Sequence, residues 1–214
     1  MTRCTARSIG TERINTSIDR ASLTVVTATS LEYRIARAEL PEVNVINAGI
    51  ALVALEQRRF SGIAISCGLA GGLQDRWPTG TVIIPDVIRH PSGESVQCDA
   101  ELVRKLRASA KALGAAYTGE PLLTSSSIVR GDARRTWAKH GFAAVDMESG
   151  LLHATRVAAV RVVLDTPQRE LNAAWLRPAT LIFHPQAWFE LPWLAREGPR
   201  CARLAARVIR GALG

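Results

Sequence analysis

AAVDMESG, residues 143–150, is the stretch that decides the fold: a short apolar run ends in Asp146 and Glu148, which flank Met147. The apolar segment 151–157 predicts a helix, and a second apolar run, 158–164, ends at Asp165. Carboxylates that follow buried strands are typical of ligand sites in α/β proteins, because ligands bind outside the carboxyl ends of the strands. In the alternative interpretation, Asp146 and Glu148 only cap the helix, where its dipole favours acids.

Strand and helix patterns alternate along the rest of the chain. Apolar or β-branched runs predict strands at 21–27, 42–47, 62–67, 81–87 and 120–129. Helices are predicted at 29–40, with Thr29 and Glu32 as a capping box, at 99–113 and 132–140, and as an apolar segment after Gly49. This alternation predicts an α/β fold, a single-domain three-layer αβα sandwich with a central mixed sheet.

Three glycines stand between residues 68 and 72, directly after the strand predicted at 62–67. Glycine permits positive-φ turns and a close approach of the backbone to a ligand. The spacing fits neither a dinucleotide-binding fingerprint nor a phosphate-binding P-loop. A plain tight turn is the alternative to a ligand-binding loop.

Composition limits the class of protein. The chain has 214 residues, of which 47% are hydrophobic, so residues 21–214 can form one domain behind a flexible tail at 1–20. No run of about 18 apolar residues predicts a membrane span, and the N-terminus has no apolar core typical of a secretory signal. The four cysteines are far apart, which favours free thiols in the cytoplasm, and no His/Cys spacing indicates a metal site.

The net charge of +8 suits a nucleic acid, an anionic membrane surface or a phosphorylated substrate. No long basic helix or RNA-binding motif is present, so no nucleic-acid partner is expected. Residues 172–214 are aromatic and basic and end in a helix predicted at 200–210. Their aromatic side chains either pack onto the core or form a surface for an apolar ligand or a membrane interface.

Four segments together resemble the nucleoside phosphorylase and nucleosidase superfamily. They are 27–32 (TATSLE), 66–73 (SCGLAGGL), 145–149 (VDMES) and 161–165 (RVVLD), and the resemblance covers residues 22–166. The C-terminal part is similar to a narrower branch, the hopanoid-associated phosphorylases, which are thought to release adenine from adenosylhopane. The resemblance implies a homodimer or a larger homo-oligomer and a cytoplasmic enzyme without a cofactor, with a peripheral contact to the inner membrane surface for a lipid-linked substrate.

The resemblance also assigns roles to individual positions. Asp165 matches the general acid that protonates N7 of the purine, and Glu148 matches the acid that binds the ribose 2′ and 3′ hydroxyls. Met147 matches the residue against the apolar face of the sugar, and Glu32 matches the acid that activates water in nucleosidases. The remaining substrate-binding positions implied by the resemblance are Gly68, Ala70, Gly71, Ser127 and Ile128.

The sequence also departs from the family pattern. Leu164 replaces a serine that typically precedes the catalytic aspartate and would orient it by a hydrogen bond. Leu69 stands where many nucleosidases have a serine. The segment from Glu148 to Asp165 is several residues shorter than in typical relatives, which predicts a shortened helix or a rerouted connection.

The activity implied is cleavage of the N-glycosidic bond of a purine nucleoside, with adenosylhopane as the favoured substrate. Glu32 favours water as the nucleophile, whereas Arg34 and Arg37 could instead hold inorganic phosphate as a co-substrate. Two alternatives are a nucleosidase for methylthioadenosine or S-adenosylhomocysteine, and a non-catalytic module that binds a nucleoside or a lipid.

Overall fold

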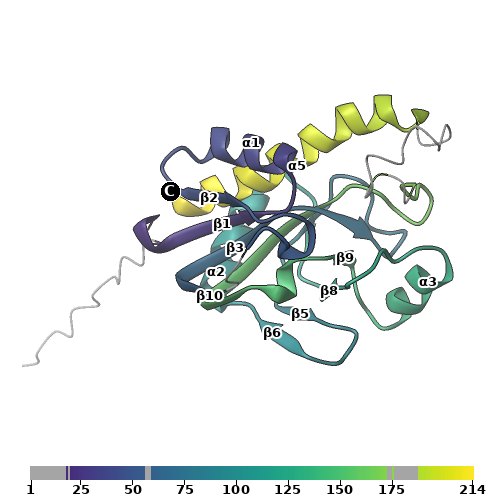
Figure 1. Cartoon of the computed structure of the whole chain (residues 1–214), viewed down its shortest axis with the longest axis horizontal. Helices are drawn as coiled ribbons and strands as arrows, with labels where there is room; N and C mark the ends of the chain where they lie inside the picture. Colours follow the sequence, from purple (N-terminus) through teal and green to yellow (C-terminus); the bar gives the residue numbers. More distant parts are fainter. Residues whose placement is uncertain (1–17, 19, 56–58, 173–174, 176–187) are drawn as a thin grey trace, which may run out of the picture.

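The computed structural model describes residues 18, 20–55, 59–172, 175 and 188–214. Its centre is one mixed sheet of ten strands in the order β6-β5-β8-β9-β3-β10-β4-β7, with β1 beside β3 and β2 beside β1 (Figure 1). The α/β class with a central mixed sheet, predicted from the alternation of patterns, is confirmed. The strands are β1 Leu23–Thr27, β2 Asn44–Asn47, β3 Arg59–Gly72, β4 Val82–Ile83, β5 Val87–Arg89, β6 Ser95–Gln97, β7 Tyr117–Thr118, β8 Leu122–Thr124, β9 Ala144–Asp146 and β10 His153–Val163.

The two longest strands, β3 and β10, lie side by side in the centre of the sheet. They pair in parallel from His153 opposite Arg59 to Val163 opposite Ala70. The helix predicted at 151–157 is therefore wrong: residues 149–151 make a single 3-10 turn and the chain then enters β10. Pairing with β3 provides partners from His153 onward, which outweighs the weak helical pattern of the segment.

The glycine run also belongs to a strand. Residues 68–72 are the last part of β3, and none of these glycines has a positive φ. The predicted positive-φ turn is thus wrong, and the glycines serve close approach instead. Gly71 and Gly72 lie in the antiparallel pairing of β3 with β9, which brings the stretch 143–150 beside the glycine run.

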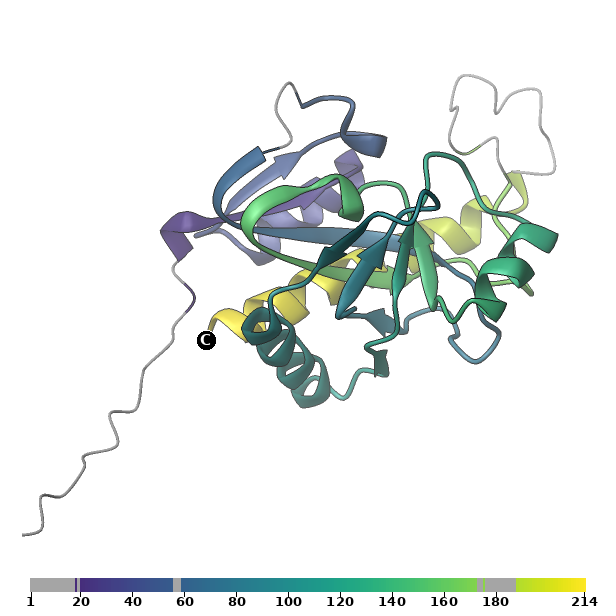
Figure 2. The same ribbon diagram turned by 90° about the horizontal axis from the view of Figure 1, so that it is seen from below.

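Three helices share one apolar core with the sheet. They are α1 Ser30–Glu39, α2 Ala100–Ala112 and α5 Leu191–Leu213, and α5 packs against both others. Alternate residues of β10, namely Ala158, Val160 and Val162, contribute to this core together with Leu164, the residue after the strand. Residues between them, such as Ala159 and Val163, belong to a second cluster with β5 and β8. Figure 2 shows α5, drawn in yellow, and α2 on one side of the sheet. The shorter α3, Asp132–Lys139, packs Trp137 near Leu123 and Val145.

The segment after Gly49 is not the predicted apolar helix. It forms one 3-10 turn, Ile50–Leu52, in which Ala51 and Leu52 have φ angles of 54° and 57°. Left-handed residues interrupt an α-helix, so the chain turns away here. Residues 56–58, which would complete the predicted helix, lie outside the described residues.

Other predictions hold with shifted bounds. The capping box of Thr29 and Glu32 is present, and Asp99 caps α2. The strand predicted at 81–87 is split into β4 and β5 around Pro85, which cannot donate to a ladder. The C-terminal helix starts at Leu191 rather than residue 200, with Pro192 in its first turn.

Most of the tail predicted at 1–20, including Cys4, lies outside the described residues. So do the C-terminal residues 173–174 and 176–187, which include Phe183 and His184. Cys67, Cys98 and Cys201 are free thiols, and burial raises the pKa of Cys67 and Cys98 to about 12 and of Cys201 to about 11. Within the described part of the chain, the helices are too short or too polar to cross a membrane.

Candidate active site

A cavity of about 460 Å³ opens at the carboxyl ends of β1, β3 and β10. Four carboxylate residues line it, Glu32, Asp146, Glu148 and Asp165, and Arg134 is the one Lys or Arg residue in the described lining. The other lining residues are mostly apolar. They are Ala28, Thr29, Leu31, Ile50, Leu69, Ala70, Gly71, Ser127, Ile128, Val129, Val145, Met147, Leu164, Leu171, Asn172, Trp175, Leu194 and Gly198.

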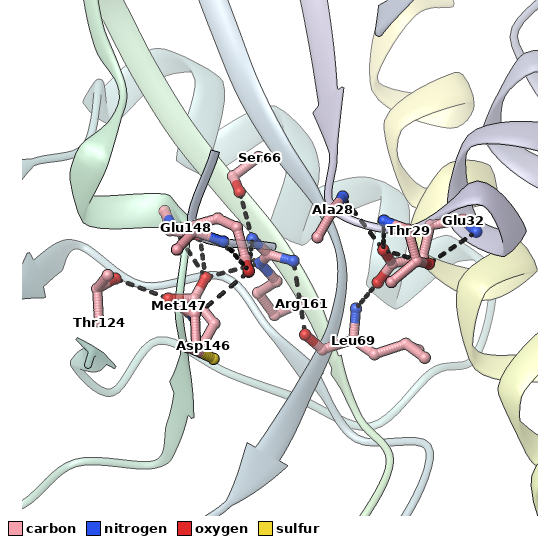
Figure 3. A network of polar contacts seen from close by, with 12 residues as sticks. Ala28, Thr29, Glu32, Ser66, Leu69, Thr124, Asp146, Met147, Glu148 and Arg161 are labelled. Atoms are coloured by element: carbon pink, nitrogen blue, oxygen red, sulfur yellow. Dashed lines mark hydrogen bonds and ion pairs between the residues drawn. The ribbon is translucent and has the colours of Figure 1, made fainter. Parts of the chain in front are cut away.

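Glu32 is held by its capping box and by β3. Its Oε2 accepts hydrogen bonds from the Thr29 amide at 2.8 Å, the Thr29 hydroxyl at 2.8 Å and the Ala28 amide at 3.2 Å. Its Oε1 accepts one bond, from the Leu69 amide at 2.7 Å (Figure 3). Since a carboxylate oxygen can accept two hydrogen bonds, Oε1 has room for one further donor.

The stretch 143–150 delivers Asp146 and Glu148 to a buried arginine, Arg161 of β10. Arg161 is 1% exposed, and its guanidinium lies 2.8 Å from Asp146 Oδ2 and 3.2 Å from Glu148 Oε2. The same guanidinium donates to the hydroxyls of Ser66 at 2.7 Å and Ser149 at 3.1 Å (Figure 3). One cation is therefore shared by two buried carboxylates.

This sharing has a consequence for protonation. Burial raises the pKa of Glu148 to about 7, and the charge of Asp146 adds to the effect, while Arg161 opposes it. Arg161 lies closer to Asp146, which also accepts bonds from the Thr124 hydroxyl at 2.6 Å and the Ser149 amide at 3.1 Å. Glu148 is thus the member of the cluster that takes up a proton near neutral pH.

The alternative in which Asp146 and Glu148 cap a helix applies in part to Asp146. Asp146 accepts bonds from the amide and hydroxyl of Ser149, so it caps the 3-10 turn Ser149–Leu151 rather than an α-helix. Glu148 accepts a bond from the Ala51 amide at 3.1 Å. That contact ties the left-handed turn at Ala51 to the cavity.

Arg161 is a site residue that the sequence predictions did not single out. A signal was present, because Arg161 interrupts the apolar run 158–164 four residues before Asp165. In a strand, residues four apart point to the same face. A charged residue on the face that carries Asp165 could therefore have been assigned to the site.

Asp165 lies two residues beyond β10 and is buried. Its Oδ2 forms a short ion pair with the guanidinium of Arg134, a residue of α3 that is only 3% exposed. Burial raises the pKa of Asp165, although the ion pair and the hydrogen bonds from Arg134 pull it in the opposite direction. Arg134 is the second site residue that the sequence predictions did not include.

Gly68 leaves the space on β3 that Glu32 and Arg161 occupy. A Cβ at this position would lie 2.3 Å from Glu32 Oε1 and 2.7 Å from Arg161 Nη1. Only glycine permits both groups to approach the strand so closely. Gly68 therefore acts by making space, and it is not among the residues that line the cavity.

The structure brings most of the predicted site residues to one place. Ten residues were candidates for the site: nine catalytic or substrate-binding positions and the phosphate ligand Arg34. Eight of the nine line the cavity: Glu32, Ala70, Gly71, Ser127, Ile128, Met147, Glu148 and Asp165. Arg34, the predicted phosphate ligand, is exposed on α1, donates to the Ser30 carbonyl at 3.3 Å and is not part of the lining.

The fold and the site define an α/β protein with a pocket of carboxylates at the strand ends. A family model of the phosphorylase superfamily matches residues 35–177, well over half of the 214 residues. The chain belongs to the phosphorylase superfamily. A comparison with curated protein sequences finds no match.

Solved structures with the same fold include nucleosidases. The 5′-methylthioadenosine/S-adenosylhomocysteine nucleosidase of Neisseria meningitidis, in complex with methylthio-immucillin-A, is 15% identical, with a TM-score of 0.64 over 89% of this chain and 97% of that one. A futalosine hydrolase variant of Helicobacter pylori is 10% identical, with a TM-score of 0.63 over 89% and 97%. A Helicobacter pylori nucleosidase variant with 5′-methylthioadenosine in its active site is 9% identical, with a TM-score of 0.65 over 90% and 97%.

Proposed function

We propose that this protein cleaves the N-glycosidic bond of a purine nucleoside and releases the free base. The observation that carries the proposal is the convergence of Glu32, Glu148 and Asp165 on one largely apolar cavity. These three acids come from separate parts of the chain. Cleavage of a glycosidic bond needs a proton donor for the leaving group, a grip on the sugar and a nucleophile, and three carboxyl groups can supply these functions.

Asp165 is the proposed general acid. Burial raises the pKa of its carboxyl group, which favours the protonated form that a proton donor needs. Asp165 protonates the base as the bond between the sugar carbon and the base nitrogen breaks. Water adds to the same sugar carbon and gives its proton to Glu32, so the products are a free sugar and a neutral base.

Glu148 and Met147 are the proposed sugar-binding residues. The Glu148 carboxylate can accept hydrogen bonds from two neighbouring hydroxyls, and Met147 lines the cavity next to it. With a pKa of about 7, Glu148 gains acceptor capacity as the pH rises through neutrality. We therefore expect KM to fall between pH 6 and pH 8.

The charge of the cavity favours water over phosphate. Its described lining has four carboxylate residues and one cation, and that cation, Arg134, already pairs with Asp165. Inorganic phosphate would enter beside the carboxylates of Glu32 and Asp146, in a described lining whose one arginine is already paired, which costs electrostatic energy. Glu32 Oε1, with room for one more donor, is suited to hold a water molecule.

The apolar side of the cavity suits a nucleoside with a large apolar substituent. Leu31, Leu171, Trp175 and Leu194 line it. This supports the lipid-linked nucleoside adenosylhopane as the substrate, with 5′-methylthioadenosine as the alternative. The aromatic side chains just before α5 support a peripheral membrane contact, since Phe189 is 84% exposed and Trp188 52% exposed.

A homodimer or larger homo-oligomer is part of the same proposal. Val53, beside the left-handed turn that contacts Glu148, is 77% exposed, and Ile50 of that turn lines the cavity. A partner that covers this apolar turn would stabilise the wall of the site. Light scattering coupled to size-exclusion chromatography measures the mass, and a monomer at micromolar concentration would overturn this part of the proposal.

The decisive experiment measures adenine release from adenosylhopane and from 5′-methylthioadenosine, with and without phosphate. We expect release without phosphate and a loss of about 10²-fold or more in Asp165→Asn and in Glu148→Gln. Asp75→Asn and Glu94→Gln, at exposed positions, are the matched controls and should keep full activity. Folded protein that releases adenine from neither substrate, yet binds adenine, would favour the non-catalytic binding module.

A further inference from the structure

We infer that Arg134 is a positioning residue that fixes the carboxyl group of Asp165 and aims its free oxygen into the cavity. The inference rests on the proposed function, in which Asp165 is the proton donor. Asp165 follows the end of β10 and is preceded by Leu164, whose side chain has no hydrogen-bond donor. The orienting group therefore has to come from another element, and α3 provides it.

Arg134 uses all three guanidinium nitrogens. Its Nε donates to the Val129 carbonyl at 3.0 Å, its Nη1 donates to the Gly72 carbonyl at 2.9 Å, and its Nη2 donates to Asp165 Oδ2. Val129 belongs to the segment that also supplies Ser127 and Ile128 to the cavity, and Gly72 ends β3. One planar group thus joins both walls of the cavity to the acid.

The two carboxyl oxygens of Asp165 have different surroundings. Oδ2 is occupied by Arg134 and also accepts a weak bond from the Leu171 amide at 3.5 Å. Oδ1 lies next to Gly71, where an added Cβ would be 3.2 Å from it, and Gly71 lines the cavity. With Oδ2 held, Oδ1 is the oxygen that can meet a ligand.

In the described part of the chain, Arg134 is the charged side chain that pairs with Asp165. Arg134 reaches it from α3, and Glu170 of the following loop lies 3.6 Å from Arg134 Nε and accepts a bond from the Gly131 amide at 2.8 Å. The facing part of β3 is Gly71 and Gly72, which carry no charge. Arg134 therefore has two separable effects: it orients the carboxyl group, and its charge lowers the pKa of Asp165 below the value that burial alone would produce.

The test replaces Arg134 by methionine and by lysine and measures the pH dependence of kcat on the nucleoside that the wild type cleaves. A general acid must be protonated, so kcat falls as the pH rises through its pKa. In Arg134→Met we expect kcat to fall about 10²-fold, because the acid is misplaced, while the alkaline limb of the profile moves to higher pH. Arg134→Lys keeps the charge without the planar group, so kcat should fall while the limb stays in place.

Two further variants sharpen the test. Arg135→Met, at the neighbouring exposed arginine of α3, is the matched control and should leave kcat and the limb unchanged. Leu164→Ser restores a hydroxyl beside the acid, and in the Arg134→Met background it should recover part of kcat. Loss of activity in Arg134→Met that accompanies a lower melting temperature, with an unmoved limb and no recovery by Leu164→Ser, would show a merely structural role.

A measurement without turnover separates this inference from the proposed function. In protein with ¹³C-labelled aspartate carboxyl groups, the Asp165 signal can be assigned with Asp165→Asn and titrated by NMR. We expect the pKa of Asp165 to rise in Arg134→Met, or in Arg134→Gln if the methionine variant does not fold. An unchanged titration would overturn the inference, whereas a wild type that cleaves no nucleoside while the titration shifts would overturn only the proposed function.

Discussion

Two buried arginines hold the acids of this cavity, and they do so in different ways. Arg161 stands in the middle of the sheet and shares its charge between Asp146 and Glu148, with serine hydroxyls around it. Arg134 stands on the eight-residue helix α3, pairs with Asp165 and lies 3.6 Å from Glu170, while main-chain carbonyls accept from its other nitrogens. The first cluster has one cation for two acids, whereas the second has two, Arg134 and Arg130, for Asp165 and Glu170.

Arg161 is part of the framework, the central sheet, whereas Arg134 is on a short helix attached to that framework. Arg161 is fixed by the register of β10 on β3, so its position depends on the whole sheet. Arg134 depends on the docking of α3 and on the carbonyls of Val129 and Gly72. We expect changes at Arg161 to affect folding most and changes at Arg134 to affect the chemistry of Asp165 most.

The largest effect is expected from Arg161→Met. Asp146 and Glu148 would stay buried without a cation, and we expect the free energy of unfolding to fall by about 3–5 kcal/mol in chemical denaturation. Arg156→Met is the matched control on the same strand, because Arg156 pairs with Asp99 and Glu101 with 31% of its side chain exposed. The control should lose no more than about 1 kcal/mol. Equal losses in both variants would contradict the contrast between framework and attachment.

Gly68→Ala tests the close approach of Glu32 and Arg161 to β3. The added Cβ would overlap both groups, and we expect a loss of about 1–3 kcal/mol together with loss of adenine release. Thermal unfolding and the activity assay measure the two effects. The control for thermal unfolding is Gly198→Ala in α5, where a Cβ would be 3.5 Å from Leu31, an ordinary contact, so stability should stay the same or rise. A stable and active Gly68→Ala protein would refute the role of this glycine.

Glu148→Gln tests whether Glu148, which shares Arg161 with Asp146, makes the stability of the protein depend on pH. The pKa of Glu148 is raised to about 7 in the folded state, so its contribution to stability is fully present below its unfolded pKa and is lost as the pH rises through about 7. The wild type should therefore become more stable as the pH falls from 8 to 5. Part of this slope should vanish in Glu148→Gln. Identical slopes in urea titrations of both proteins would argue against proton uptake by Glu148.

The smallest effect is expected from Glu170→Gln. Glu170 lies 3.6 Å from Arg134 and 3.5 Å from Arg130, and its side chain is 22% exposed. We expect a change in the free energy of unfolding of about 1 kcal/mol or less, with kcat nearly unchanged, because Arg134 keeps its bonds to Val129 and Gly72. A large loss of kcat would mean that the loop, rather than the main-chain carbonyls, holds Arg134 in place.

Local signals predicted several elements correctly. The capping box of Thr29 and Glu32 and the Asp99 cap are decided within a few residues, so the sequence is sufficient for them. The segment 151–157 was predicted as a helix because its apolar pattern is ambiguous over seven residues. Its strand state comes from pairing with β3, a partner about 90 residues earlier in the chain.

The alternation of strand and helix patterns is enough to predict the class of fold, and the sequence also offers Glu32, Glu148 and Asp165 as candidate acids, which the structure brings to one cavity. Only the tertiary structure decided which cation each acid meets. Arg134 follows a turn at Gly131 and Arg161 lies inside an apolar run, and neither pattern names a partner. Ion pairs between residues such as Arg134 and Asp165, which are 31 positions apart, form only after the sheet has set both walls of the cavity, because burial and distance together fix their strength.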